Sequence, residues 1–149
     1  MTEIRRTIEI NASPEEVFTV LTDLDRLPDW STITVATHDV PAARLSKDDR
    51  FRQSLRVVGR QIDAQWTVTA LDRPRHVAYE ATGPGGAHLR MSQTVTGDRG
   101  RSTVSFEIDY ELPGGVVGDL AASILERRNE REVEHSLHNL KDLAEHVKG

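Results

Sequence analysis

Apolar and polar residues alternate in the first segment of the chain, MTEIRRTIEI. Ile4, Ile8 and Ile10 share one face of a period-two pattern, and the other face carries charged and hydroxyl side chains. This alternation is typical of a β-strand with one buried face. Arg6 also lies on the apolar face, near the start of the strand, where its long side chain can carry the charge out to water. The segment therefore predicts a half-buried first strand.

A helix start follows directly, in NASPEEVF. Ser13 stands before the first helical position, Pro14 occupies that position, and Glu16 comes three residues after the serine. With this spacing, the hydroxyl and the carboxylate can each accept a hydrogen bond from the backbone N–H of the other residue. The expected buried stripe of this helix consists of Val17, Phe18 and Leu21.

A second short helical turn is expected before the next strand. Leu24 and Leu27 have helical spacing, and Pro28 is expected to end the turn because proline disrupts a helix interior. Trp30 would then stand at the start of the next extended run.

Six further segments have the pattern of strands, and the connections between most of them are short and rich in turn-forming residues. Short connections of this kind favour antiparallel pairing of successive strands, as in a meander. With the first strand, this predicts a curved antiparallel sheet of about seven strands. The six segments are residues 32–39, 49–58, 60–71, 76–82, 87–96 and 102–112.

A long C-terminal helix is expected after Pro113 and the two glycines that follow it, because the next thirty or so residues contain no proline and one glycine. Its apolar residues form two stripes, in 116–125 and 133–147, that point roughly 150° apart. The segment 126–132 between them has no apolar residue. We expect a bend there, and packing of the first stripe against another element or subunit is the alternative. Extending the second stripe backwards points Asn129 toward the interior.

Two glutamines interrupt the apolar face of the predicted sheet. Gln53 and Gln93 each have apolar side chains two residues away on both sides. A buried amide without a partner costs about 1–3 kcal/mol, so each must bond the other, the backbone, water or a ligand. Four amphipathic aromatic residues could line a pocket, and core packing is the alternative for each. They are Trp30, Trp66, Tyr79 and Tyr110.

Length and composition exclude several classes of protein. A chain of 149 residues is most simply a single domain, 1–149. Its net charge of -5 provides no extended basic surface for nucleic acid, and no segment is apolar enough for a membrane span. With no cysteine, thiolate nucleophiles and disulfides are excluded. The six histidines form no evident metal-ligand set, and none has an acidic partner at convincing spacing.

The order of these elements resembles that of the START-related helix-grip (SRPBCC) superfamily, in particular its bacterial polyketide cyclase/dehydrase-like branch. The segment IEINASPEEVFTVLTDLDRLPDW is similar to the opening of that family, and ERRNEREVEHSLHNLKDLAEHV is similar to its closing helix. The resemblance covers essentially the whole chain. It implies an α+β helix-grip fold, in which a curved antiparallel sheet and two short helices surround a long C-terminal helix and enclose a hydrophobic cavity.

Three functions remain open at this point. The first is binding or transport of a hydrophobic small molecule, lipid-, polyketide- or quinone-like, in that cavity. The alternatives are a cofactor-free polyketide cyclase/dehydratase and a protein-interaction or dimerisation module. A cytoplasmic protein is expected, with no nucleic-acid partner, no integral membrane association, no cofactor, no metal and no assignable catalytic residue, and with homodimerisation left open. The expected ligand-binding residues are Trp30, Gln53, Trp66, Tyr79, Met91, Gln93, Phe106, Tyr110 and Asn129.

Overall fold

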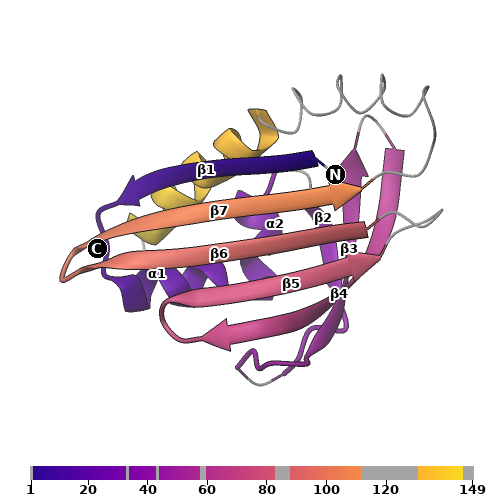
Figure 1. The fold of residues 1–149 in the computed structure, drawn as a ribbon, viewed down its shortest axis with the longest axis horizontal. Coiled ribbons are helices and arrows are strands. Elements are labelled where there is room, and N and C mark those ends of the chain that lie inside the picture. Colours follow the sequence, from indigo (N-terminus) through magenta and orange to yellow (C-terminus); the bar gives the residue numbers. More distant parts are fainter. Residues whose placement is uncertain are drawn as a thin grey trace.

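The computed structural model describes residues 2–32, 34–42, 44–57, 60–82, 88–111 and 131–145 (Figure 1). Seven strands form one antiparallel sheet, and the short helices follow the first strand. The elements are β1 (Thr2–Ile10), α1 (Pro14–Leu21), the 3-10 helix η1 (Leu24–Arg26), α2 (Leu27–Trp30), β2 (Thr34–His38), β3 (Arg50–Val57), β4 (Arg60–Asp72), β5 (His76–Thr82), β6 (His88–Asp98) and β7 (Arg101–Glu111). Residues 131–145 form the described part of the C-terminal helix.

The sheet is the predicted meander, with one additional pairing between its first and last strands. The strand order is β1-β7-β6-β5-β4-β3-β2, so every neighbour after β1 is also a neighbour in sequence. Figure 1 shows β2 and β3 turned away from the direction of β1 and β7, so the sheet curves. The short helices and the C-terminal helix lie on one side of it. This is the α+β helix-grip architecture expected from the sequence.

The first helix begins as its sequence predicts. The backbone N–H of Glu16 donates to the Ser13 hydroxyl at 3.2 Å, and the backbone N–H of Ser13 donates to the Glu16 carboxylate at 3.2 Å. Both halves of the capping box are therefore formed. The helix packs against β6 and β7 and buries Val17, Phe18, Val20 and Leu21.

The prediction for the second turn was wrong at its end. Pro28 lies in the first turn of α2, and the helix continues to Trp30, which is its last residue. Proline is tolerated in a first helical turn because its missing N–H has no partner there in any case. Trp30 thus belongs to a helix packed against β2 and not to the next strand.

The core lies between the helices and the inner face of the sheet. It combines the apolar residues of alternating strand positions with the second stripe of the C-terminal helix, as expected. In residues 131–145 of that helix, the buried apolar residues are Val133, Leu137, Leu140 and Ala144. The first stripe and residues 126–130 of the segment where we expected a bend, Asn129 among them, lie outside the described residues; residues 131 and 132 of that segment are already helical.

Candidate functional site

The inner face of the sheet brings most of the expected ligand-binding residues to the same side. Tyr79 on β5 pairs with Met91 on β6, and Gln93, two residues further along β6, pairs with Phe106 on β7. Because alternate residues of a strand share a face, these side chains form a continuous strip across three strands. Tyr79, Gln93 and Phe106 are buried, and Met91 is half-buried.

Gln53 bonds to its neighbours through both ends of its amide. Trp66 Nε1 donates to Gln53 Oε1 at 2.7 Å, and Gln53 Nε2 donates to the Thr34 hydroxyl at 2.5 Å. Thr34 in turn donates to the Ser31 hydroxyl at 2.7 Å. These contacts join β4, β3, β2 and the end of α2 in one chain of hydrogen bonds, of which the two made by Gln53 are buried. The amide of Gln53 and the indole N–H of Trp66 are therefore both satisfied within the protein.

Gln93 is placed differently, although it interrupts the same face. Its side chain is 2% exposed, and its Nε2 atom has the thioether sulfur of Met91 as a weak acceptor at 3.4 Å. Its Oε1 atom is buried and has no hydrogen-bond partner among the described residues. Most buried polar atoms in native proteins are paired, so an orphaned carbonyl oxygen marks a position that an unseen group can complete.

Trp30 also has an orphaned polar atom. Its Nε1 atom is buried and lacks a partner within the described part of the chain. Its backbone carbonyl, by contrast, accepts a hydrogen bond of 3.3 Å from Asn139 on the C-terminal helix. The main chain of Trp30 is therefore tied to that helix, while its indole N–H is left with donor capacity.

Tyr79 lies against two other aromatic rings. The centre of its ring is 6.0 Å from that of Phe51 and 6.2 Å from that of Trp66, and both pairs are arranged edge to face. Burial raises the pKa of Tyr79 well above its usual value, and the positive charge of Arg73 opposes this only in part. The phenol is therefore neutral at physiological pH, where it can donate or accept a hydrogen bond but does not act as a base.

The connection between β2 and β3 contributes a core residue that the sequence pattern did not predict. Leu45, in the connection between β2 and β3, is 5% exposed, and its carbonyl accepts a hydrogen bond of 2.6 Å from Arg73. The Arg73 guanidinium also lies 5.6 Å from the centre of the Phe18 ring. Burial, together with the charge of Arg44, lowers the pKa of Arg73. Arg73 thus joins the β4–β5 turn to α1 and to this connection.

The C-terminal helix is fastened on two sides. On the side of β1, Arg6 forms an ion pair with Glu134 at 3.3 Å, so its head reaches the surface as the sequence suggested. On the side of α2, the backbone N–H of Thr32 donates to the Ser136 hydroxyl at 3.0 Å. The helix therefore spans the concave side of the sheet between its two edges.

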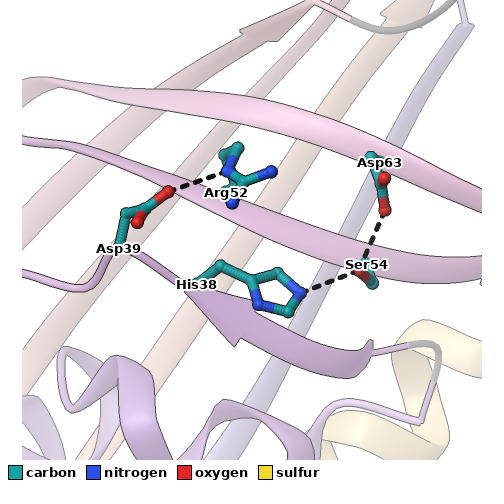
Figure 2. Close-up of polar contacts among 5 residues, drawn as sticks. All are labelled: His38, Asp39, Arg52, Ser54 and Asp63. Atoms are coloured by element: carbon teal, nitrogen blue, oxygen red, sulfur yellow. Dashed lines mark hydrogen bonds and ion pairs between the residues drawn. The ribbon is translucent and has the colours of Figure 1, made fainter.

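A polar cluster lies on the outer face of the sheet, across β2, β3 and β4 (Figure 2). The Nε2 atom of His38 is 3.1 Å from the Ser54 hydroxyl, which donates a hydrogen bond of 2.9 Å to Asp63. Arg52 Nε donates to Asp39 at 2.8 Å beside it.

This cluster does not have the geometry of a hydrolase triad. In a triad, the serine donates to a histidine that the carboxylate orients. Here the single hydroxyl proton of Ser54 goes to Asp63, so the contact with His38 requires the histidine to be the donor. The cluster stabilises the outer face of the β2 edge and does not activate a nucleophile.

The structure places most of the expected site residues in the interior. Trp30, Gln53, Trp66, Tyr79, Gln93 and Phe106 are buried, and Met91 is half-buried among them. Tyr110 lies on β7, pairing with Leu89 and Thr2, but its side chain and all of Asn129 are outside the description. Sequence reasoning missed Thr34 and Ser31 as partners of Gln53, because the strand register that joins them carries no local signal.

Two features are absent from the part of the chain that the structure describes. No group of three or more histidine, aspartate or glutamate side chains in these segments could hold a metal ion. None of the helices within them is both long and apolar enough to cross a membrane.

Comparisons with known proteins agree with this architecture. Residues 1–145 match the family described as polyketide cyclase / dehydrase and lipid transport. A curated relative, the toxin Rv0910 of Mycobacterium tuberculosis, is 24% identical over 127 residues, which cover 84% of this chain and 88% of the relative.

Two solved structures share the fold. The ZhuI aromatase/cyclase of Streptomyces sp. R1128 superimposes with a TM-score of 0.80 at 21% identity, over 97% of this chain and 93% of that one. A START superfamily protein of Mycobacterium smegmatis gives a TM-score of 0.66 at 18% identity, over 95% and 97% of the two chains. Since the family match covers nearly the whole chain, this protein belongs to the polyketide cyclase / dehydrase and lipid transport family.

Proposed function

We propose that this protein binds or carries a hydrophobic small molecule, lipid-, polyketide- or quinone-like, between the inner face of the sheet and the C-terminal helix. The proposal places the ligand against the strip of Tyr79, Met91, Gln93 and Phe106. Gln53 and Trp66 support one wall, and Trp30, Tyr110 and Asn129 complete the set expected from the sequence.

The observation that carries this proposal is the pair of orphaned polar atoms in an interior whose other buried polar groups, such as Gln53 and Thr34, are hydrogen-bonded. Trp30 Nε1 and Gln93 Oε1 are both buried without a partner among the described residues. Leaving one such atom unpaired costs about 1–3 kcal/mol, so retaining two in a small domain needs a compensating role. A ligand that is apolar over most of its surface and polar at a few points would provide one.

Binding is favoured over catalysis by the ionisable groups of the interior. General acid–base catalysis needs a group with a pKa near the working pH, within reach of the reacting atoms. Along the described inner face, Tyr79 has its pKa raised by burial, and Arg6 is engaged by Glu134 at the surface. The neutral phenol of Tyr79 is therefore not suited to act as a base at neutral pH. A cyclase or dehydratase activity is therefore the alternative outcome of the test below.

The proposal also covers the location of the protein and its partners. We place the protein in the cytoplasm, acting on a small molecule with no nucleic-acid partner and no integral membrane association. The fold is shared with both an aromatase/cyclase and a START protein, so family membership is compatible with a carrier and with an enzyme.

The first experiment is native mass spectrometry of the protein purified without detergent, followed by organic extraction and mass analysis of any passenger. A passenger in stoichiometric amount would support the proposal and identify its chemical class. The same protein, emptied by extraction and refolding, is then titrated with that molecule or with a set of fluorescent hydrophobic probes. Probes that are converted to a new product would support the cyclase or dehydratase alternative.

An empty protein that takes up none of these probes would contradict the proposal. In that case, the same spectra report whether the chain is a monomer or a dimer. A dimer without any ligand would favour the interaction module instead.

A further inference from the structure

The orientation of the Gln93 amide is fixed by its neighbour on the same strand. The sulfur of Met91 has no hydrogen to donate and is a weak acceptor, and it lies 3.4 Å from Gln93 Nε2. Rotating the amide by half a turn would place the carbonyl oxygen against this sulfur, and neither atom could donate. The NH2 group therefore faces Met91, and the unpaired atom is the carbonyl oxygen, an acceptor.

The neighbours of Gln93 across the sheet offer no donor to this oxygen. Its partners in the strand register are Val77 on β5 and Phe106 on β7, which have apolar side chains. Gln53, on the same face, shows that the fold can satisfy an inner glutamine completely, with Trp66 as donor. The fold as a whole therefore does not prevent an inner glutamine from being paired, and the donor is missing only because of the residues that surround Gln93.

The charge of the missing donor follows from the surroundings. An ammonium group would need a buried counter-ion, and the ionised side chain nearest in the register, Arg6, is itself positive and bonded to Glu134. A carboxylate has no proton to give. Unlike these two groups, a neutral hydroxyl can donate to the carbonyl oxygen without bringing a charge into the interior.

We propose that Gln93 Oε1 is the polar recognition point of the ligand site, and that it accepts a hydrogen bond from a neutral hydroxyl group, alcoholic or phenolic, on a hydrophobic molecule. This inference rests on the proposed function, because it specifies the ligand of the same site. It assigns different roles to the two inner glutamines. Gln93 selects the ligand, while Gln53 connects β2, β3 and β4 through its hydrogen bonds to Thr34 and Trp66.

The test compares two probes that differ only in the proton to be donated. 2-Naphthol has a hydroxyl group, and 2-methoxynaphthalene keeps the ring and the oxygen but has no donor. Dissociation constants are measured for wild-type protein and for Gln93→Met, which has a similar volume and no carbonyl. We expect the wild type to prefer the naphthol by about ten-fold or more, since a paired group discriminates against an analogue that leaves it unpaired. Gln93→Met should bind both probes equally, with the affinity that the wild type has for the ether.

Phe106→Leu is the matched control, because it changes the shape of the site next to Gln93 without changing its acceptor. It should alter both affinities together and keep their ratio. Folding of each variant is checked by its melting temperature. The ratio of the two dissociation constants is also measured on the wild type alone. The proposal can therefore still be refuted if Gln93→Met does not fold.

Three results would overturn the proposal, and they differ in what else they overturn. Equal affinity of the wild type for both probes, or an unchanged preference in Gln93→Met, would show that Gln93 does not select a hydroxyl, while hydrophobic binding itself would stand. Failure of both probes and of longer-chain alcohols to bind the wild type would overturn the proposed function together with this inference.

Discussion

The two tryptophans of the core use their indole N–H groups differently. Trp66 donates to Gln53, whereas Trp30 Nε1 is buried without a partner among the described residues. Both side chains are almost fully buried, at 3% and 2% exposure, so the difference does not come from access to water. The difference comes from the acceptors near each indole N–H. Trp66 has the Gln53 carbonyl oxygen beside it, which makes that hydrogen bond a structural contact, whereas the indole N–H of Trp30 is available to another group.

At the residue scale, the first prediction concerns Gln53→Leu. The substitution leaves the indole N–H of Trp66 and the hydroxyl of Thr34 without their present partner, and should lower the free energy of unfolding by about 1–3 kcal/mol. Urea denaturation measures the change. In the double variant with Trp66→Phe, part of the cost should disappear, because no buried indole donor remains to be orphaned. Strictly additive single and double changes would show that the two side chains are not coupled.

The second prediction concerns the titration of Tyr79. Burial raises its pKa in the native state, while in the unfolded chain it titrates near its ordinary value of about 10. Above that pH, the unfolded state loses a proton that the native state keeps, so the free energy of unfolding falls as the pH rises. Below it, Tyr79 contributes no pH dependence.

Tyr79→Phe removes this titration and serves as the comparison. In a series from about pH 8 to about pH 11, the wild type should lose stability relative to the variant only at the upper end, where the pH reaches the unfolded pKa. Urea midpoints of the two proteins at each pH measure it. Parallel curves across the range would mean that the Tyr79 hydroxyl ionises as readily in the native protein as in the unfolded chain.

At the element scale, the beginning of α1 determines how the chain leaves β1 and packs against β6 and β7. Ser13→Ala removes the hydroxyl that accepts the Glu16 N–H, and should cost about 1 kcal/mol of unfolding free energy. Thermal and urea denaturation both report this loss. Thr19→Ala on the exposed side of the same helix is the control, and its effect should be smaller because the hydroxyl there bonds only the Glu15 carbonyl in its own helix. An equal effect of the two substitutions would contradict a special role for the cap.

Most of the elements were predictable because their signals are local. Alternating faces and short turns gave the strands and their meander, and β5 has the predicted bounds, His76–Thr82. The pairing of β1 with β7 and the register shift between Val68 and Ala70 on β4 depend on contacts between distant segments, which no local pattern records. Leu45 escaped notice for the same reason, since a single leucine in a polar connection has no periodicity.

The candidate site was predictable only as a set of residues on one face. Gln53 and Gln93 have the same kind of flanking residues in sequence, and nothing local distinguishes them. The difference depends on Trp66, Thr34 and Met91, which reach the two amides through strand register and through side-chain direction. Sequence therefore indicated where polar groups interrupt the inner face, and the structure showed which of them is already paired.

At the scale of the whole molecule, occupation of the interior should stabilise the fold. A ligand that binds only the native state raises the free energy of unfolding by about 2.7 kcal/mol when its concentration is one hundred times its dissociation constant. For a domain of this size, that corresponds to a rise in melting temperature of roughly 5–11 °C. Differential scanning fluorimetry with the natural passenger, or with the best probe, measures it. A ligand that binds with such saturation and leaves the melting temperature unchanged would have to bind the unfolded chain equally well.

The pairing of β1 with β7 also determines how the chain can assemble during synthesis. The residues of β1 pair with partners about a hundred positions later, so this ladder closes a long loop and cannot form until β7 has been made. Many long-range pairings of this kind are associated with slow folding. While the nascent chain waits, β1 is an unpaired strand, and the charges of Arg5 and Glu9 on its exposed face discourage pairing with a neighbouring chain. A ribosome-bound chain that stops before β7 should therefore be bound by chaperones, and one that extends beyond it should be released.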